Sequence, residues 1–152
     1  MRVSAKTDYA LRAAAEIASA TGDAPVKGER IAAAQDIPLR FLENILSELR
    51  NAGIVESRRG AEGGYLLARP PSEIALADVI RAVDGPLANV GGRRPEQLSY
   101  SGSAESYREV WVAVRAGLRT VLESITLADV AAGKLPGAVR KLTSDPDAWE
   151  PH

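Results

Sequence analysis

The sequence predicts a mainly α-helical fold with one small β-hairpin and a long helix set apart from it. The first observation behind this prediction is a helical repeat in residues 36–53, whose apolar residues recur three and four positions apart. The second is a pair of short β-prone runs, at 54–55 and 65–67, that flank a glycine-rich segment. The third is a seven-residue apolar repeat over residues 105–125.

The repeat in residues 36–53 predicts a helix with one apolar face and one polar face. The apolar face comprises Leu39, Leu42, Ile45, Leu46 and Leu49. The polar face comprises Arg40, Glu43, Asn44 and Ser47. Pro38 suits a first helical turn, and Gly53 suits the position just past a helix end. Such a helix packs through one face and leaves the other in solvent.

The predicted hairpin has a basic tip. Arg58 and Arg59 precede the glycine-rich segment at residues 60–64, and Pro70-Pro71 ends the unit because neither proline can donate to a strand ladder. A polar-faced helix followed by a basic hairpin is the layout of a winged helix-turn-helix, whose helix enters the major groove while its wing reaches a neighbouring groove or the backbone. The same layout is also a common packing unit, so this stretch alone leaves both interpretations open.

Two further helices are expected before this unit. Ser4 suits an N-cap. The stripe that follows it is apolar and mostly small: Tyr9, Ala10, Ala13, Ala14, Ile17 and Ala18. A break at residues 21–25 separates this helix from a short one at 26–34. Three helices and a hairpin in this order predict a winged helix-turn-helix, DNA-binding domain over residues 1–71.

The second segment, residues 72–135, is expected to contain a linker helix at 74–83, a variable loop at 87–104 and the dimerisation helices. In the long helix, the spacings of 4, 3, 4, 3 and 4 positions match a coiled-coil seam: Tyr107, Trp111, Val114, Leu118, Val121 and Ile125. This helix covers either its own domain or a second copy. Because the winged domain already has a core, we expect a homodimer with this seam as its interface.

The tail, residues 136–152, is polar and contains two further prolines beyond Pro136. It is expected to be disordered.

Composition excludes most enzyme classes. No cysteine is present and the only histidine is His152, which removes disulfides, thiolate chemistry and any internal Ser-His-Asp arrangement. Phosphate-cradling and nucleophile motifs are also missing from the sequence, so no enzymatic activity is expected.

Net charge and hydropathy limit the kinds of binding partner that the sequence predicts. The 152 residues carry a formal net charge of −1, so a DNA-binding surface must come from local placement of charge rather than from bulk basicity. No apolar run reaches the roughly 18 residues of a membrane span, and the first dozen residues are charged throughout. A cytoplasmic protein with no membrane partner is therefore expected.

Taken in order, these segments resemble the Rrf2 family of bacterial transcription regulators, which contains the IscR-like and NsrR-like repressors. The resemblance covers residues 2–132 and rests on KTDYALRAAAEIA at 6–18, IPLRFLENILSELRNAGIVESRRG at 37–60, GGYLLARP at 63–70, IALADVIRAVDG at 74–85 and ITLADVA at 125–131. It implies a homodimer joined through the long helix. It also implies that Arg40, Phe41, Glu43 and Asn44 read bases and that Arg59 enters the minor groove.

The chain departs from that family pattern in its cysteines. Many members carry three cysteines between the short helix and the dimer helix, where they bind an iron–sulfur cluster, whereas residues 89–107 here contain none. Asp8, which matches a carboxylate ligand in some relatives, cannot hold a cluster alone because these clusters depend mainly on thiolates. No cofactor and no metal are expected.

The resulting prediction is a homodimeric, sequence-specific transcription regulator, a repressor, whose partner is double-stranded operator DNA and which has no iron–sulfur cluster. The sequence leaves three alternatives open for its signal: a small molecule, a partner protein or no effector at all. The alternative prediction is a regulatory protein that acts mainly by binding a partner protein or small molecule, with weak or no DNA binding.

Overall fold

The computed structural model describes residues 2–20 and 23–152, so part of the predicted break at residues 21–25 lies outside it. The first half of the chain forms α1 (Ala5–Ser19), α2 (Gly28–Gln35), α3 (Leu39–Asn51), β1 (Val55–Arg58) and β2 (Gly64–Leu67). The second half forms α4 (Leu76–Asp84), α5 (Tyr107–Leu122), α6 (Leu127–Ala131) and α7 (Gly137–Thr143), with 3-10 turns at Pro71–Glu73, Pro95–Gln97, Gly102–Ala104 and Pro146–Trp149. This confirms the predicted fold class.

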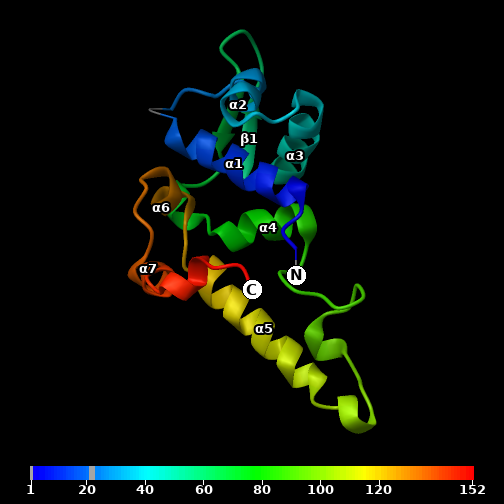
Figure 1. The fold of residues 1–152 in the computed structure, drawn as a ribbon. Coiled ribbons are helices and arrows are strands. Elements are labelled where there is room, and N and C mark those ends of the chain that lie inside the picture. The colour runs from blue at the N-terminus through cyan, green and yellow to red at the C-terminus, as the bar shows by residue number, and fades with distance from the viewer. Residues whose placement is uncertain (1, 21–22) are drawn as a thin grey trace.

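Helix α1 is the central element of the upper body in Figure 1, where α2 and the hairpin lie on one side of it and α4 on the other. It contacts α2, α3, α4, α6 and β2. Ser4 caps it by accepting a hydrogen bond from the Thr7 backbone N–H at 3.0 Å. Ala10, Ala13 and Ala14 are fully buried, and their small side chains let the surrounding elements approach closely.

The turn between α2 and α3 is tight. Asp36 closes α2 with a left-handed φ of 50°, a conformation that aspartate tolerates better than most residues. Helix α3 buries Leu42, Ile45, Leu46 and Leu49, which confirms its predicted apolar face. Leu39 is the exception at 38% exposed, because it lies in the first turn at the margin of the core. Gly53 follows α3 with a φ of 73°, as expected of a residue that ends a helix.

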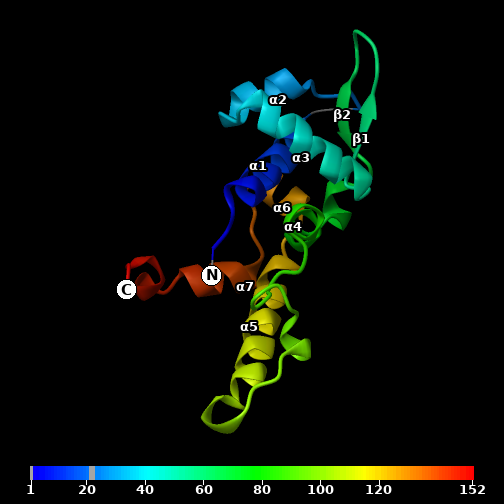
Figure 2. The same ribbon diagram turned by 90° about the vertical axis from the view of Figure 1, so that its right-hand side faces the viewer.

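Strands β1 and β2 form an antiparallel hairpin in which Val55 pairs with Leu67 and Arg58 with Gly64. The hairpin is also anchored at the start of α2. Val26 and Tyr65 exchange two backbone hydrogen bonds, of 2.9 and 2.8 Å, on the free edge of β2. Figure 2 shows the hairpin loop projecting from the end of the molecule that is farthest from α5.

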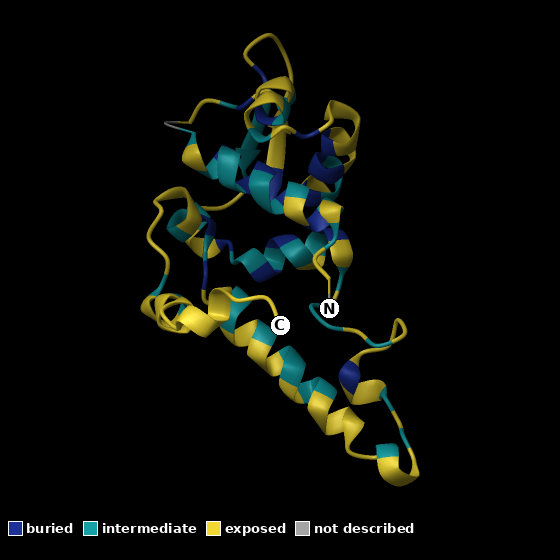
Figure 3. Ribbon diagram, viewed as in Figure 1, coloured by how far each residue is buried: buried dark blue, intermediate teal, exposed yellow. Residues whose placement is uncertain are grey.

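Helix α5 leaves the upper body, and the chain after it returns. The Leu76 N–H donates to the Ile125 carbonyl at 2.9 Å, and the Leu127 N–H donates to the Ile74 carbonyl at 3.0 Å. These bonds tie the segment after α5 to the start of α4. Figure 3 shows most of the buried positions in the upper body, while α5 carries only intermediate and exposed ones.

The prediction that Ile125 belongs to the helical seam is wrong. Helix α5 ends at Leu122, and Ile125 is only 6% exposed, inside the core of its own chain. The heptad spacing continues through position 125, but the backbone bond to Leu76 turns the chain out of the helix before that point.

The tail also differs from the expectation of disorder. Its two short helical segments are α7 and the turn at Pro146–Trp149. Pro146 starts that turn rather than breaking it, and the Asp145 carboxylate caps it by accepting from the Asp147 N–H at 3.0 Å. The Trp149 indole N–H donates to the Thr143 carbonyl at 2.8 Å and joins the turn to α7.

Candidate nucleic-acid interface

The outer face of α3 is polar and exposed. Arg40, Glu43 and Asn44 are exposed, and Ser47 is half-buried. Phe41 is 61% exposed, an unusual position for the only phenylalanine of the chain. The four fully or nearly fully buried apolar residues of α3 hold the opposite face against the core, so packing fixes the direction in which these side chains point.

Arg40 and Glu43 lie three residues apart, a spacing at which opposite charges on a helix commonly pair. Within residues 2–20 and 23–152, neither side chain takes part in an ion pair. Their hydrogen-bonding groups therefore remain available to an external partner. Arginine can donate two bonds to guanine, asparagine can bond adenine on two atoms, and glutamate can accept from cytosine.

The wing carries two exposed arginines, Arg58 and Arg59, just before its tip. Arg58 lies 3.9 Å from the Glu56 carboxylate, at the outer limit of an ion pair. Gly63 is essential to the turn, because a Cβ there would lie 2.3 Å from the Arg58 carbonyl oxygen. Glu62 is exposed at the tip and places a negative charge beside the arginines.

Three basic residues outside the predicted set share this end of the molecule. Arg50, in the last turn of α3, lies 3.5 Å from the Ser57 hydroxyl at the base of the wing. Lys27 and Arg30 are exposed at the start of α2. Helix-turn-helix domains use such flanking positions to bind phosphates. In the sequence these residues are single charges in short polar stretches, and only the fold brings them beside α3 and the wing.

Five of the six predicted dimer residues lie on α5, but not all of these five are fully exposed. Tyr107 is 53% exposed and stacks on Trp111, with ring centroids 6.4 Å apart. Trp111, Val114 and Leu118 are half-buried and line a hollow of about 760 Å³, whose other wall is formed by the N-terminus and by the loop after α4. Val121 is half-buried. Leu122, rather than Ile125, continues this row.

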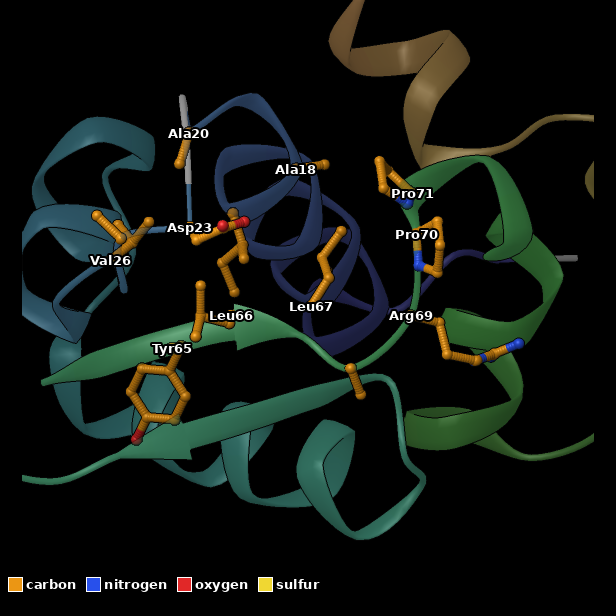
Figure 4. A pocket seen from close by; sticks show the side chains of 13 residues that line it. Ala18, Ala20, Asp23, Val26, Tyr65, Leu66, Leu67, Arg69, Pro70 and Pro71 are labelled. Carbon is orange, nitrogen blue, oxygen red and sulfur yellow. The ribbon is translucent and has the colours of Figure 1, made fainter.

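A second hollow, of about 420 Å³, lies between the end of α1 and β2 (Figure 4). Most of its lining residues are of apolar types, and Asp23 and Arg69 are its charged members. Figure 4 shows these two side chains at different ends of the hollow, so they do not form a joint catalytic site. Among the described residues, no group of three or more histidine, aspartate and glutamate side chains is placed to hold a metal ion.

A family model for Rrf2, described as an iron-dependent transcriptional regulator, matches residues 3–133. The chain belongs to the Rrf2 family. It is 36% identical over 132 residues to the HTH-type transcriptional regulator CymR of Bacillus subtilis, covering 87% of this chain and 91% of that protein. It is 51% identical over 150 residues to Rv1287 of Mycobacterium tuberculosis, which is named as an HTH-type transcriptional regulator. That match covers 99% of this chain and 93% of Rv1287.

Solved structures agree with this membership. The structure of Bacillus subtilis CymR, titled the global cysteine regulator, superimposes with a TM-score of 0.75 at 34% identity, covering 88% of this chain and 98% of that one. The T. potens IscR structure gives a TM-score of 0.68 at 33% identity and covers 100% of this chain and 93% of that one. Because Rrf2 proteins are regulators rather than enzymes, the chain is a helix-turn-helix transcriptional regulator.

The family description names iron, but the side chains of this Rrf2 protein do not fit an iron–sulfur cluster. Such clusters are bound mainly by cysteine thiolates, and this sequence has no cysteine. Glu96, in the loop between α4 and α5, accepts a hydrogen bond from Arg115. A backbone hydrogen bond at Glu96, followed by the hydrogen bond from Arg115, holds the pKa of the Glu96 carboxyl below its usual range. That carboxylate is thus engaged within its own chain.

Among residues 2–20 and 23–152, no helix has the length and apolar character needed to span a bilayer.

Proposed function

We propose that this Rrf2 protein is a homodimeric, sequence-specific repressor that binds double-stranded operator DNA in the cytoplasm. The observation that carries the proposal is the outer face of α3, where Arg40, Glu43 and Asn44 are exposed and, in the case of the two charged residues, have no ion-pair partner in the described chain. A major groove accepts a helix of this kind. Phe41 adds an apolar group that can contact a thymine methyl.

The wing adds contacts outside the major groove. Arg59, together with Arg58, is suited to the negative potential of a minor groove or of the phosphate backbone. Arg50, Lys27 and Arg30 are suited to phosphates that flank the α3 contact. Together they supply local positive charge in a chain whose net charge is −1.

A homodimer would explain why the apolar side chains of α5 are not fully buried within one chain. Tyr107, Trp111, Val114, Leu118 and Val121 leave apolar surface that the winged body does not bury. A second α5 would cover it. A two-fold dimer would then present two α3 helices to half-sites about one helical turn, roughly 34 Å, apart.

We also propose that the protein signals without an iron–sulfur cluster. This part of the proposal rests on the cysteine count of zero. Anaerobically purified protein is expected to lack visible absorbance and bound inorganic sulfide. Stoichiometric iron with sulfide in the purified protein would overturn it.

The test of DNA binding is a binding-site selection with the full-length protein at a stated, near-physiological salt concentration, followed by mobility-shift titration. We expect a palindromic motif. Arg40→Ala is expected to weaken binding to that motif, whereas Arg93→Ala, which removes an exposed charge far from α3, should not. Equal affinity for all sequences, or no binding, would favour the alternative of a regulator that acts through a partner protein or small molecule.

A further inference from the structure

A third hollow, of about 520 Å³, lies where the end of α4, the loop after it and α5 meet. Four of its lining residues are arginines: Arg81, Arg94, Arg115 and Arg119. Glu96 is its single acidic lining residue, and Gly85, Pro86 and Leu87 complete the wall. The arginines come from three segments that are far apart in the sequence, so their convergence is a product of the fold.

Three of these arginines are held in place by carboxylates. Arg81 and Arg119 both donate to the same Glu123 oxygen, Arg119 at 3.0 Å. Arg115 donates to Glu96. A guanidinium group has five N–H donors, and these bridges occupy only one or two of them on each arginine. The ion pairs fix the guanidinium groups in place but leave their other N–H donors able to bind a further acceptor.

Arg94 has no ion-pair partner within residues 2–20 and 23–152. The Arg94 backbone exchanges hydrogen bonds with Gln97: its carbonyl accepts from the Gln97 backbone N–H at 2.9 Å, and its N–H donates to the Gln97 side-chain amide oxygen at 3.4 Å. Counting Glu96, Glu123 and Asp78, which lies 3.8 Å from Arg81, the four guanidinium groups face three carboxylates. The cluster therefore keeps an excess positive charge in a chain whose net charge is −1.

We propose that this arginine hollow, lined by Arg81, Arg94, Arg115 and Arg119, binds a small oxyanion, the phosphate or carboxylate group of a low-molecular-weight ligand. The planar fork of arginine matches both groups and can bind either on two oxygens. The volume falls within the range of roughly 300–1,000 Å³ that small-molecule sites occupy. In the structure Arg81, Arg115 and Arg119 already bind carboxylates, and an incoming oxyanion makes the same kind of contact.

A small ligand fits the position better than the DNA backbone does. In Figure 1, α1 lies between the wing and both α4 and α5, the helices that contribute three of the four arginines of the hollow, so the hollow is separated from the wing by α1. A ligand there would touch α4, which belongs to the winged body, and α5 at the same time.

The test uses the full-length protein without DNA, so it does not depend on DNA binding. Thermal unfolding and calorimetric titration are carried out with inorganic pyrophosphate and, separately, with citrate, while potassium chloride keeps the ionic strength constant. These two probes distinguish a phosphate ligand from a carboxylate ligand. A ligand that binds only the folded state raises the unfolding temperature with concentration.

Arg93→Gln is the matched control, because it removes the same charge one position away and Arg93 does not line the hollow. We expect at least one of the two probes to raise the unfolding temperatures of the wild type and of Arg93→Gln by the same amount. The same probe should bind Arg94→Gln with an affinity at least tenfold lower than its affinity for the wild type. Arg94→Lys, which keeps the charge and loses the fork, should fall between them. If Arg94→Gln fails to fold by circular dichroism, Arg119→Gln serves in its place.

Two results would overturn the inference. One is that neither probe raises the unfolding temperature of the wild type above the value in the potassium chloride control. The other is that Arg93→Gln weakens binding as much as Arg94→Gln does, because the effect would then reflect net charge rather than a site.

Discussion

Helices α3 and α5 are both amphipathic, but only α3 buries its apolar face within its own chain. Helix α3 buries Leu42, Ile45, Leu46 and Leu49 in the core of its own domain. Helix α5 is longer, at 16 residues against 13, and none of its side chains is fully buried. An apolar stripe therefore shows that a helix has a partner, but not whether that partner lies in the same chain.

The two helices also differ in how they are attached. Helix α3 is held by the apolar core. One ion pair joins Arg81 of α4 to Glu123, the residue that follows α5, and another joins Arg115 of α5 to Glu96 of the loop. Exposed ion pairs contribute little to stability. Core substitutions should therefore act on folding, while substitutions on α5 should act on association or ligand binding.

The largest expected effect is that of Leu118→Asp. Burying leucine contributes about 1.5–3 kcal/mol, and a symmetric interface loses this contribution twice. We expect a wild-type dimer and a monomeric variant in sedimentation at micromolar concentration. Thr120→Asp adds the same charge at an exposed position of α5 outside the predicted seam, so this variant should remain dimeric. A wild-type monomer under these conditions would contradict the proposed dimer.

In the monomeric Leu118→Asp background, Leu46→Ala should lower the free energy of unfolding by about 2–5 kcal/mol, because Leu46 is fully buried in α3. Val110→Ala, on the exposed part of α5, should change it by less than about 0.5 kcal/mol. Urea denaturation measures both. Equal losses would show that α5 contributes to the same core as α3.

On the outer face of α3, Glu43→Ala should relax sequence specificity by about 1–3 kcal/mol at one base pair of each half-site. Non-specific affinity should stay equal or rise, since a carboxylate near phosphates is repelled. A binding-site selection with the variant measures this. An unchanged motif would remove Glu43 from the set of base readers.

Arg59→Ala tests the wing. If Arg59 contacts a phosphate, the slope of log affinity against log salt concentration should fall by about one, and binding should weaken similarly on all sequences. Titrations at several salt concentrations measure the slope. A loss confined to one motif position, with an unchanged slope, would instead indicate base or minor-groove reading.

The smallest expected effect concerns Asp84, at the junction of α1 and α4. A hydrogen bond from Thr7 and a second from Ser4, at 2.7 Å, hold the pKa of Asp84 below its usual range, with a further contribution from the charge of Lys6. Because the folded-state pKa is lowered, Asp84 stabilises the fold above pH 3.8 and loses this contribution as the pH falls below it. The unfolding temperatures of the wild type and Asp84→Asn should therefore differ at pH 7 and converge under acid conditions. A constant difference would assign the effect to packing.

Much of the fold could be predicted because the signals are local. The 3.6-residue period places Leu42 and Leu46 on one face of α3 whatever surrounds them. Gly53 and the glycines of the wing predict turns, because few other residues adopt their backbone conformations. The same pattern places Arg40, Glu43 and Asn44 on the opposite face, so the candidate site on α3 is also a local feature.

Only the tertiary structure decided which part of the molecule packs against each apolar helix face. The heptad spacing included Ile125, but backbone bonds to the start of α4 take that residue into the core. The arginine hollow could not be predicted either, because Arg81, Arg94 and Arg119 carry no shared spacing and meet only where α5 crosses the end of α4. Periodicity determines which residues share a face, whereas the path of the chain determines what that face meets.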